Sequence, residues 1–360
     1  MSTGKVTRVE GENGVAIELS DRRPLGGSGI DVSVCGLGGN VFGGARLDRS
    51  RSEVVIKTAL DLGVNFVDTA NVYGGGESET YIGQALGSRR AEMVIATKFN
   101  LREYDGGPLG AHVRAQAEES LRRLGTDHID LYQLHDVRPG VDADALLEVL
   151  HALADEGKIR AFGACNIAAW RVAEWRHAAE SRGWAGPQTV QNYYHLLARQ
   201  AEAEVLPYAS GHGVGFLPYH PLAGGFLTGK YRFGEERPPG TRGAAGSPII
   251  NVMDTEANHR AVERLAEIAA REGRTLGELA LAWVASRPGV TSVIAGVSNI
   301  EQLTLNVAGC TWKLGDDVLA EIDRVTAPTG VPSPERFPYL PGQRPRHTAS
   351  TGPGGQSGKG

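Results

Sequence analysis

The 360-residue sequence is poor in several features, and each shortage excludes a class of protein. Its three cysteines, Cys35, Cys165 and Cys310, are widely spaced and form no CxxC pair, so we expect a reduced protein without structural disulfides. No apolar run approaches the roughly 20 residues of a membrane-spanning helix. The first residues lack the apolar centre of a secretory signal. These absences favour a cytoplasmic protein that has no membrane partner.

Excess charge of one sign is also missing. The formal net charge is -5, and 22% of the residues are charged. This composition predicts no basic face for nucleic acid. Apolar residues make up 41% of the chain, which is ordinary for a soluble globular protein. The length suits two average domains or one large α/β barrel.

Short apolar runs alternate with amphipathic stretches along most of the chain. Several of the amphipathic stretches begin with Ser or Asp and end in Gly, as helices do. Most runs are followed by a helical stretch, which predicts parallel βαβ units. Eight units favour a closed (β/α)8 TIM barrel, and an open doubly wound sheet is the alternative. The expected strands are 31–37, 64–67, 93–97, 128–134, 159–164, 187–191, 213–219 and 291–295.

The remaining segments divide the chain into three parts. Residues 1–21 form an N-terminal extension, 22–326 the barrel, and 327–360 a tail rich in Pro and Gly whose last dozen residues we expect to be disordered. Residues 22–33 look like a hairpin that leads into the first strand. The loop 222–252, after strand seven, is long enough to be a lid. The aromatic part of the tail would fold onto the barrel or another subunit, so a homo-oligomer stays open.

Four polar residues follow three successive strands. In "VNFVDTANVYGGGESE" (64–79) the strand ends on Asp68, and Tyr73 lies on the loop behind it. Lys98 and His135 end the next two strands. Each has an ordinary alternative: Asp68 could cap a helix, Lys98 could be solvated, His135 could be a core histidine and Tyr73 could simply pack. Because barrel strands all end at one face, we expect the four side chains to meet there.

These four groups suit proton transfer to an oxygen. A free phenol has a pKa near ~10, and a nearby ammonium lowers it. We expect Lys98, held by Asp68, to do this for Tyr73. His135 can donate a hydrogen bond to a carbonyl oxygen. No Ser or Cys nucleophile is paired with a base, and no metal-ligand cluster is apparent in the sequence. A hydride carried by a cofactor is therefore the expected reactant.

The motifs that carry these residues resemble the aldo-keto reductases, in particular a bacterial branch related to potassium-channel beta subunits. The stretches "GVNFVDTANVYGGGESETYIGQAL", "VIATK" and "IDLYQLH" are similar to that family, and the likeness extends from residue 22 to 326. The resemblance implies a (β/α)8 barrel that reduces aldehydes or ketones with NADPH. It also implies that Tyr73 is the general acid, that Asp68 and Lys98 tune it, and that His135 orients the carbonyl.

The same resemblance implies a set of cofactor-binding residues. The nicotinamide and its ribose would contact the first loop and the ends of the middle strands, and Tyr219 would stack on the ring. Cys165 and His220 stand where serine is usual. The residues assigned to this end are Gly38, Gly39, Asn40, Asp68, Cys165, Asn166, Gln191, Tyr219, His220, Pro221 and Leu222.

The rest of the cofactor would lie along the lid and the last loop. The run from Leu222 through Gly224 to Lys230 would wrap the pyrophosphate. Gly296, Ser298, Gln302 and Asn306 would hold the adenosine end. Many relatives carry a basic residue in place of Ser298, so selection of NADP would depend on Arg242 in the lid, with Arg237 as the alternative.

The sequence also offers two other interpretations. "GGFLTGKY" (224–231) is nearly a phosphate-binding Walker A loop, but Tyr231 replaces the Ser or Thr that holds magnesium. The resemblance to channel subunits supplies an alternative function, an NADP(H)-sensing binding subunit with slow or vestigial reduction. The substrate would be a small carbonyl compound. A composition rich in Ala, Gly and Arg suggests a GC-rich genome, which favours a natural-product or sugar ketone as the substrate.

Overall fold

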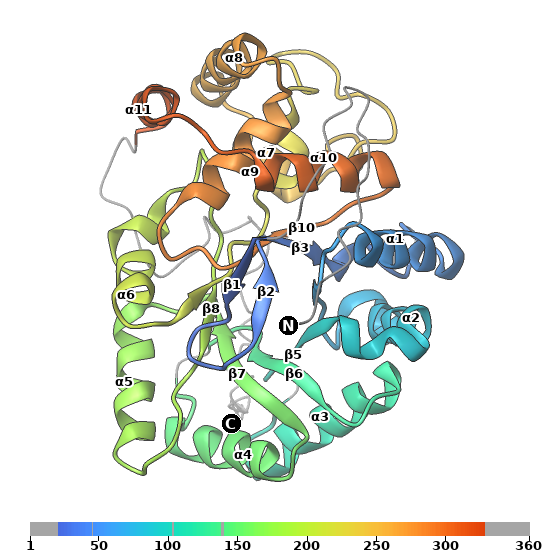
Figure 1. Cartoon of the computed structure of the whole chain (residues 1–360), viewed down its shortest axis with the longest axis vertical. Coiled ribbons are helices and arrows are strands. Elements are labelled where there is room, and N and C mark those ends of the chain that lie inside the picture. The colour runs from blue at the N-terminus through green and yellow to red at the C-terminus, as the bar shows by residue number, and fades with distance from the viewer. Residues whose placement is uncertain (1–20, 45, 103, 138–139, 328–360) are drawn as a thin grey trace, which may run out of the picture.

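The computed structural model describes residues 21–44, 46–102, 104–137 and 140–327, and its helices surround one curled sheet of eight parallel strands (Figure 1). The sheet order is β10-β3-β4-β5-β6-β7-β8-β9. The strands of this sheet are β3 (Cys35–Gly38), β4 (Phe66–Asp68), β5 (Val94–Phe99), β6 (Ile129–Leu134), β7 (Ile159–Cys165), β8 (Thr189–Gln191), β9 (Gly215–Phe216) and β10 (Val293–Ala295).

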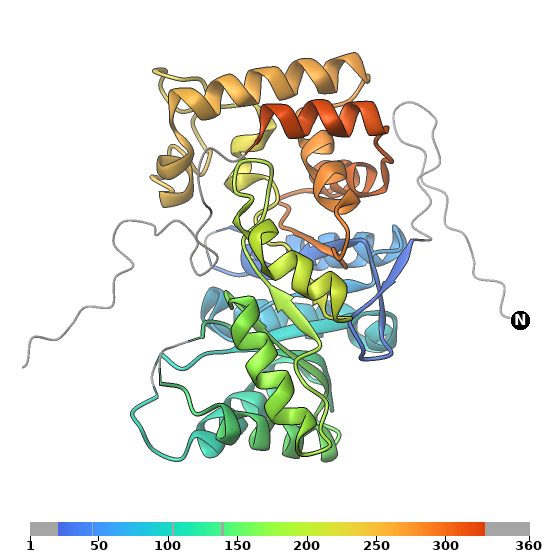
Figure 2. The same ribbon diagram turned by 90° about the vertical axis from the view of Figure 1, so that its left-hand side faces the viewer.

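Most strands are followed by a helix that packs outside the sheet. The helices are α1 (Arg49–Asp61), α2 (Glu77–Leu86), α3 (Leu109–Leu124), α4 (Ala143–Asp155), α5 (Ala169–Glu180), α6 (Val205–Gly211), α7 (Pro248–Met253), α8 (Glu256–Arg271), α9 (Leu276–Ser286), α10 (Ile300–Thr311) and α11 (Asp316–Val325). Figure 2 shows that α8 and α11, which contact each other, lie outside α9 and α10. None of the described helices is long and apolar enough to cross a membrane.

Hydrogen bonds also connect the two ends of the sheet. The Phe216 amide donates to the Gly289 carbonyl oxygen at 3.2 Å, and the Thr291 amide donates to the Phe216 carbonyl oxygen at 2.9 Å. Further along, the Ile294 amide donates to the Pro218 carbonyl oxygen at 2.9 Å. The segments of β9 and β10 are therefore neighbours, which is consistent with a (β/α)8 barrel and not with an open doubly wound sheet.

The observed strands differ from the expected bounds by one or two residues at most ends, and two of them differ more. The stretch 31–37 is divided, because Asp31–Ser33 (β2) pairs antiparallel with Arg22–Pro24 (β1), and the sheet strand starts at Cys35. Within the expected strand 213–219, only the two residues of β9 form a strand, and Tyr219 forms an isolated bridge. Pro218 has no amide hydrogen to donate to a neighbouring strand, which accounts for this interruption.

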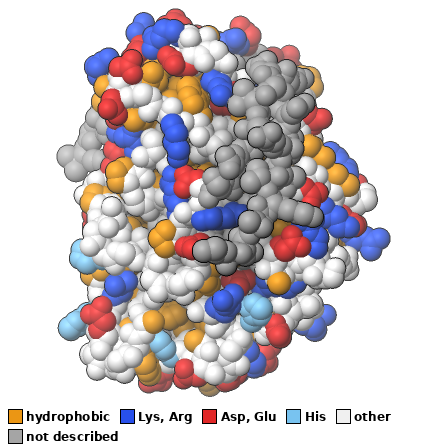
Figure 3. Space-filling model, viewed as in Figure 1, with side chains coloured by type: hydrophobic (Ala, Val, Ile, Leu, Met, Phe, Trp, Pro, Cys, Tyr) orange, Lys and Arg blue, Asp and Glu red, His pale blue; other side chains and the backbone are white. Residues whose placement is uncertain are grey.

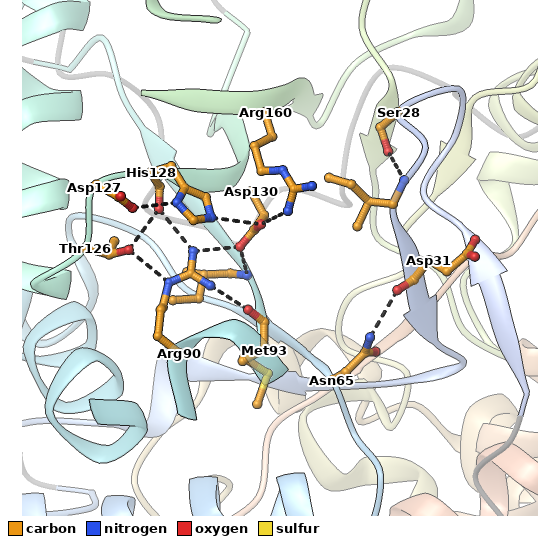
Figure 4. Close-up of polar contacts among 12 residues, drawn as sticks. Ser28, Asp31, Asn65, Arg90, Met93, Thr126, Asp127, His128, Asp130 and Arg160 are labelled. Atoms are coloured by element: carbon orange, nitrogen blue, oxygen red, sulfur yellow. Dashed lines mark hydrogen bonds and ion pairs between the residues drawn. The ribbon is translucent and has the colours of Figure 1, made fainter. Parts of the chain in front are cut away.

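The β1–β2 hairpin lies across one end of the sheet (Figure 1). Its apolar side chains form a small core with residues from the strands. That cluster consists of Leu25, Ile30, Val32, Phe66, Ala96, Leu131, Ala161, Leu217 and Ile294. Asn65 attaches the hairpin at its edge, since its Oδ1 accepts from the Ser33 amide at 2.7 Å and its Nδ2 donates to the Asp31 carbonyl oxygen at 3.0 Å (Figure 4). The hairpin thus closes the amino ends of the strands and leaves the carboxyl ends for chemistry.

A charged network surrounds Asp130, near the start of β6 (Figure 4). Its buried carboxylate accepts from Arg90 at 2.8 Å, from Arg160 at 3.0 Å and from the Ile95 amide at 2.9 Å. On the face drawn in Figure 3, side chains of both charge signs are intermixed. The expected extension 1–21 and tail 327–360 lie outside the described residues, apart from Asp21 and Ala327.

Candidate active site

The four polar residues at the strand ends come together as the sequence predicts. Asp68 is the last residue of β4, Lys98 is the second-last of β5, and His135 follows β6 directly. These strands are neighbours, with β4 paired to β5 and β5 to β6. Tyr73 opens a short 3-10 helix, η2 (Tyr73–Gly76), behind β4.

Lys98 and Asp68 form a buried ion pair. The Lys98 Nζ lies 2.6 Å from Asp68 Oδ2 and 2.8 Å from the Thr69 carbonyl oxygen. The other carboxylate oxygen of Asp68 accepts from Gln191 Nε2 at 2.8 Å and from Gln133 Nε2 at 3.3 Å. Burial alone would lower the pKa of Lys98, but Asp68 and, to a smaller extent, Tyr73 raise it above its usual value. The lysine therefore stays charged beneath the phenol.

Three glycines allow the turn that places Tyr73 over the strands. Gly74, Gly75 and Gly76 have φ angles of 57°, 65° and 98°. Residues that carry a Cβ rarely adopt such positive φ angles. A Cβ at Gly76 would also lie 2.8 Å from the Nε atom of Arg123. The glycine run in the sequence is thus the means by which the chain turns back after β4.

Tyr73 lies against both Lys98 and His135. The Lys98 Nζ is 5.3 Å from the centre of the Tyr73 ring, and the Tyr73 and His135 ring centres are 5.7 Å apart in an edge-to-face arrangement. Among the described residues, the buried Nδ1 of His135 has no hydrogen-bond partner. A buried polar atom of this kind costs free energy, which favours a bound group as its partner.

The expectation that the pKa of Tyr73 is lowered is wrong. Burial raises the pKa of Tyr73 to about 12, although the Lys98 charge acts to lower it. Burial likewise lowers the pKa of His135 to about 3, with Lys98 and Arg102 contributing, so the imidazole is neutral. Burial also raises the pKa of Cys165 despite Lys98, which keeps its thiol protonated. Tyr73 is thus a proton donor that stays protonated at neutral pH.

A cavity of about 1470 Å³ opens above this group. Apart from Lys98, which is fully buried, and Arg237, the alternative to Arg242, every site residue expected from the sequence lines it. Those lining residues are Gly38, Gly39, Asn40, Asp68, Tyr73, His135, Cys165, Asn166, Gln191, Tyr219, His220, Pro221, Leu222, Gly224, Lys230, Arg242, Gly296, Ser298, Gln302 and Asn306. The cavity exceeds the roughly 300–1,000 Å³ of a pocket for one drug-sized molecule.

Several of the residues expected at the nicotinamide already bind one another. Tyr219 donates from its hydroxyl to Asn166 Oδ1 at 2.7 Å, and Asn166 donates from Nδ2 to Asp136 Oδ1 at 3.1 Å. Gln191 donates to Asp68, so its expected contact with the cofactor amide would use the remaining carbonyl oxygen. These bonds hold the ring of Tyr219 and the turn at Asn166, whose φ is 53°, in fixed positions.

Cationic side chains gather at the lid side of the cavity. Two glycines with positive φ, Gly224 and Gly225, form a turn against which the Lys230 ammonium lies, since a Cβ at Gly225 would be 3.0 Å from its Nζ. Burial lowers the pKa of Arg242, and the nearby Arg46 adds to this effect. Cations that lie close to each other are typical of an anion site.

At the other end of the cavity, Ser298 lies just before α10 and Gln302 lies in the first turn of that helix. The Ser298 amide donates to Gln302 Oε1 at 2.8 Å. Arg51 Nη2 donates to the Ser298 carbonyl oxygen at 3.4 Å, so a guanidinium from α1 lies beside this corner. The sequence predicts Arg242 there, with Arg237 as the alternative, but Arg237 is paired with Asp254 at 2.8 Å and does not line the cavity. Sequence reasoning missed Arg46 and Arg51, and no sequence motif separates them from other surface arginines.

The sequence analysis also did not identify Gln133 and Thr69, which form hydrogen bonds with the ion pair. Gln133 is a polar residue inside the apolar run of β6, and such a residue at an inward position was a readable signal. The Thr69 contact uses a backbone carbonyl oxygen, which any residue would supply. Among the described residues, no cluster of three His, Cys, Asp or Glu side chains is spaced to hold a metal ion.

The residues of the cavity fit a dinucleotide cofactor. His135, the lid cations Lys230 and Arg242, and Ser298 and Gln302 at α10 all line the same cavity. Gly38 and Gly296 approach each other so closely that a Cβ at Gly38 would be 3.1 Å from the Gly296 amide nitrogen. This donor set and this shape suit a long anionic ligand.

Known proteins are similar to this chain over most of its length. Residues 35–327 match the model of the aldo/keto reductase family. The chain is 33% identical to the uncharacterised oxidoreductase YrpG of Bacillus subtilis, over 88% of this chain and 98% of the relative. It is 35% identical to aflatoxin B1 aldehyde reductase member 2 of Rattus norvegicus, over 74% and 77%. It is 34% identical to a probable voltage-gated potassium channel subunit beta of Arabidopsis thaliana, over 79% and 89%.

Proposed function

The chain belongs to the aldo/keto reductase family, and we propose that it reduces an aldehyde or ketone to an alcohol with NADPH, with Tyr73 as the general acid. The observation that carries the proposal is the position of Tyr73, against the buried Lys98–Asp68 pair and the neutral His135 on the cavity wall. A phenol and an imidazole that face one point can bind and protonate a carbonyl oxygen.

Each residue has a distinct task in this mechanism. His135 is neutral and can donate a hydrogen bond that orients the carbonyl. Tyr73 gives its proton to the oxygen as negative charge develops there. Lys98 then stabilises the phenolate, and Asp68 keeps Lys98 charged and in place. The cofactor, when bound, supplies the hydride that adds to the carbonyl carbon.

The cofactor would lie along the cavity from Tyr219 to α10. Tyr219, fixed by Asn166, would stack on the nicotinamide, and Lys230 would contact the pyrophosphate. Ser298 and Gln302 would bind the 2′-phosphate of NADPH while Arg242 closes over it. The position of Arg51 beside Ser298 gives this corner a second cation.

The decisive experiment is the Tyr73→Phe variant. It removes the proton donor and leaves the ring, so NADPH should still bind while aldehyde reduction falls by about 10²–10⁴-fold. NADPH oxidation with a panel of aldehydes and ketones, together with a fluorescence titration of NADPH, separates the two effects. Near-normal turnover in this variant would remove Tyr73 from the mechanism.

The plant relative named as a probable potassium channel subunit beta supports a second candidate, an NADP(H)-sensing subunit with slow reduction. The complete group of Tyr73, Lys98, Asp68 and His135 favours turnover instead. Steady-state turnover distinguishes the two, because a sensor would bind NADPH tightly yet reduce every member of the panel only slowly.

A further inference from the structure

The cavity has a side that the proposed cofactor contacts leave free. Apart from Asp68 at the end of β4, the cofactor candidates come from the ends of β3 and β7 to β10 and from the lid. A second group of lining residues comes from the loops that follow β5, β6 and β7, which are neighbouring strands (Figure 1). They include Arg102, Asp136, Val137, Trp170 and Arg171. This side lies beside His135 and is therefore where a substrate would lie.

Positive charge is in excess on this side. Arg102 is paired with Asp136, but only at 3.5 Å, and 59% of the Arg102 side chain is exposed. Asp136 is also shared, because its other carboxylate oxygen accepts from Asn166. Across the described part of the chain, Arg171 has no carboxylate partner. Two guanidinium groups and one carboxylate thus line this side of the cavity, which leaves one positive charge without a counterion.

A flat apolar surface lies next to this charge. Trp170 is 49% exposed, which is high for tryptophan, and lies in the first turn of α5. The Arg171 guanidinium is stacked over the indole, 4.5 Å from its ring centre. Val137 is a partly buried apolar neighbour on the adjoining loop. An indole edge and a guanidinium together suit a planar ligand with a negative charge at one end.

Resting on the proposed reductase function, we propose that the substrate is an aldehyde or ketone that carries a carboxylate. Arg102 and Arg171 bind the carboxylate, and the flat apolar part of the molecule lies against Trp170. One surplus positive charge matches a monoanion better than a phosphate, which carries more charge. Arg102 pairs with Asp136, the residue next to His135, so the anion is held close to the reacting carbonyl.

The first test compares two substrates that differ only in charge. These are 4-carboxybenzaldehyde, which is anionic at pH 7, and its neutral methyl ester, methyl 4-formylbenzoate. We expect kcat/KM with NADPH to be about tenfold or more higher for the acid, since a charge-assisted contact has that order of effect. A ratio of acid to ester at or below one would overturn the proposal.

Variants assign the effect to the two arginines. Arg102→Gln and Arg171→Gln should each lower the acid-to-ester ratio by about three- to tenfold, and the double variant should bring it to about one. Arg264→Gln, an exposed arginine on α8 outside the cavity, removes the same charge and should leave the ratio unchanged. A ratio that survives the double substitution contradicts the proposed contacts.

Trp170 is tested with a second pair of substrates. Trp170→Ala should lower kcat/KM for 4-carboxybenzaldehyde by about tenfold, and for 4-oxobutanoate, which has no ring, by much less. Equal losses for both would exclude the stacking role.

Binding provides a readout that is independent of turnover. Calorimetry with NADP⁺ present compares 4-(hydroxymethyl)benzoate with its methyl ester, and the acid should bind about tenfold more tightly. If no aldehyde is reduced but this preference holds and disappears in the double arginine variant, the proposed reaction fails and the anion site stands. If neutral aldehydes are reduced well and no preference is found, only the anion site fails.

Discussion

The Lys98 ammonium lies 2.6 Å from the Asp68 carboxylate at the end of two adjacent strands, and both side chains are almost completely buried. Two buried charges of opposite sign compensate each other, whereas one alone would be strongly unfavourable. This pair therefore serves stability and chemistry together, because it keeps a cation directly under the Tyr73 ring.

Lys98→Met should lower both the stability of the fold and the rate of reduction. It leaves the Asp68 carboxylate buried without its cation, which costs about 3–5 kcal/mol in the free energy of unfolding. Reduction should also slow, because the Tyr73 phenolate loses its stabilising charge. Urea unfolding of Lys98→Met, Asp68→Asn and the double variant measures the coupling. Strictly additive losses of stability would show that the two groups do not interact.

The pH dependence should differ between the two reaction directions. Since burial raises the pKa of Tyr73 to about 12, the phenol stays protonated and kcat/KM for carbonyl reduction should be flat between about pH 7 and 10. Alcohol oxidation with NADP⁺ needs the phenolate and should rise about tenfold per pH unit over this range. An apparent pKa near 7 to 8 in the reduction profile would mean that another group supplies the proton.

Arg242→Ala should weaken NADPH binding by about one to two orders of magnitude and barely affect NADH. The reason is that a guanidinium over the 2′-phosphate makes contacts that NADH lacks. Arg232→Ala, in an exposed part of the same loop, is the matched control. If Arg51→Ala causes the selective loss instead, the phosphate contact belongs to the arginine beside Ser298. Equal losses for both cofactors would place Arg242 elsewhere.

Cys165→Ser should keep or tighten NADPH binding. The thiol is buried, lines the cavity and is held protonated, so it is a weak hydrogen-bond donor that a hydroxyl can replace with a stronger one. A fluorescence titration of NADPH against the variant gives the dissociation constant. Much weaker binding would contradict the placement of Cys165 at the nicotinamide amide.

Asp130→Ala should destabilise the fold without changing the chemistry. It leaves Arg90 and the Ile95 amide without their buried acceptor, which costs about 3 kcal/mol or more (Figure 4). Asp127→Ala, a highly exposed neighbour, should cost far less. Urea unfolding measures both, and kcat/KM of the folded Asp130→Ala protein should stay within about twofold of wild type. A large loss of kcat/KM would link this network to the cavity.

The sequence by itself determined the fold class and the placement of the reactive residues. Alternating apolar and amphipathic stretches predict parallel strands with helices between them, and every parallel strand delivers its last residue to the same end of the sheet. Asp68, Lys98 and His135 could therefore be assigned to one rim from their positions alone. The three glycines after Tyr73 likewise indicate a backbone turn that only glycine adopts easily.

Only the tertiary structure decided the quantities that depend on distant neighbours. The net direction of the Tyr73 pKa depends on burial, which outweighs the Lys98 charge and which local sequence does not reveal. The hairpin pairing that divides the stretch 31–37 depends on a competing partner, β1. Arg51 reaches Ser298 across 247 positions of sequence. Burial and long-range contacts result from packing of the whole chain, so no local pattern encodes them.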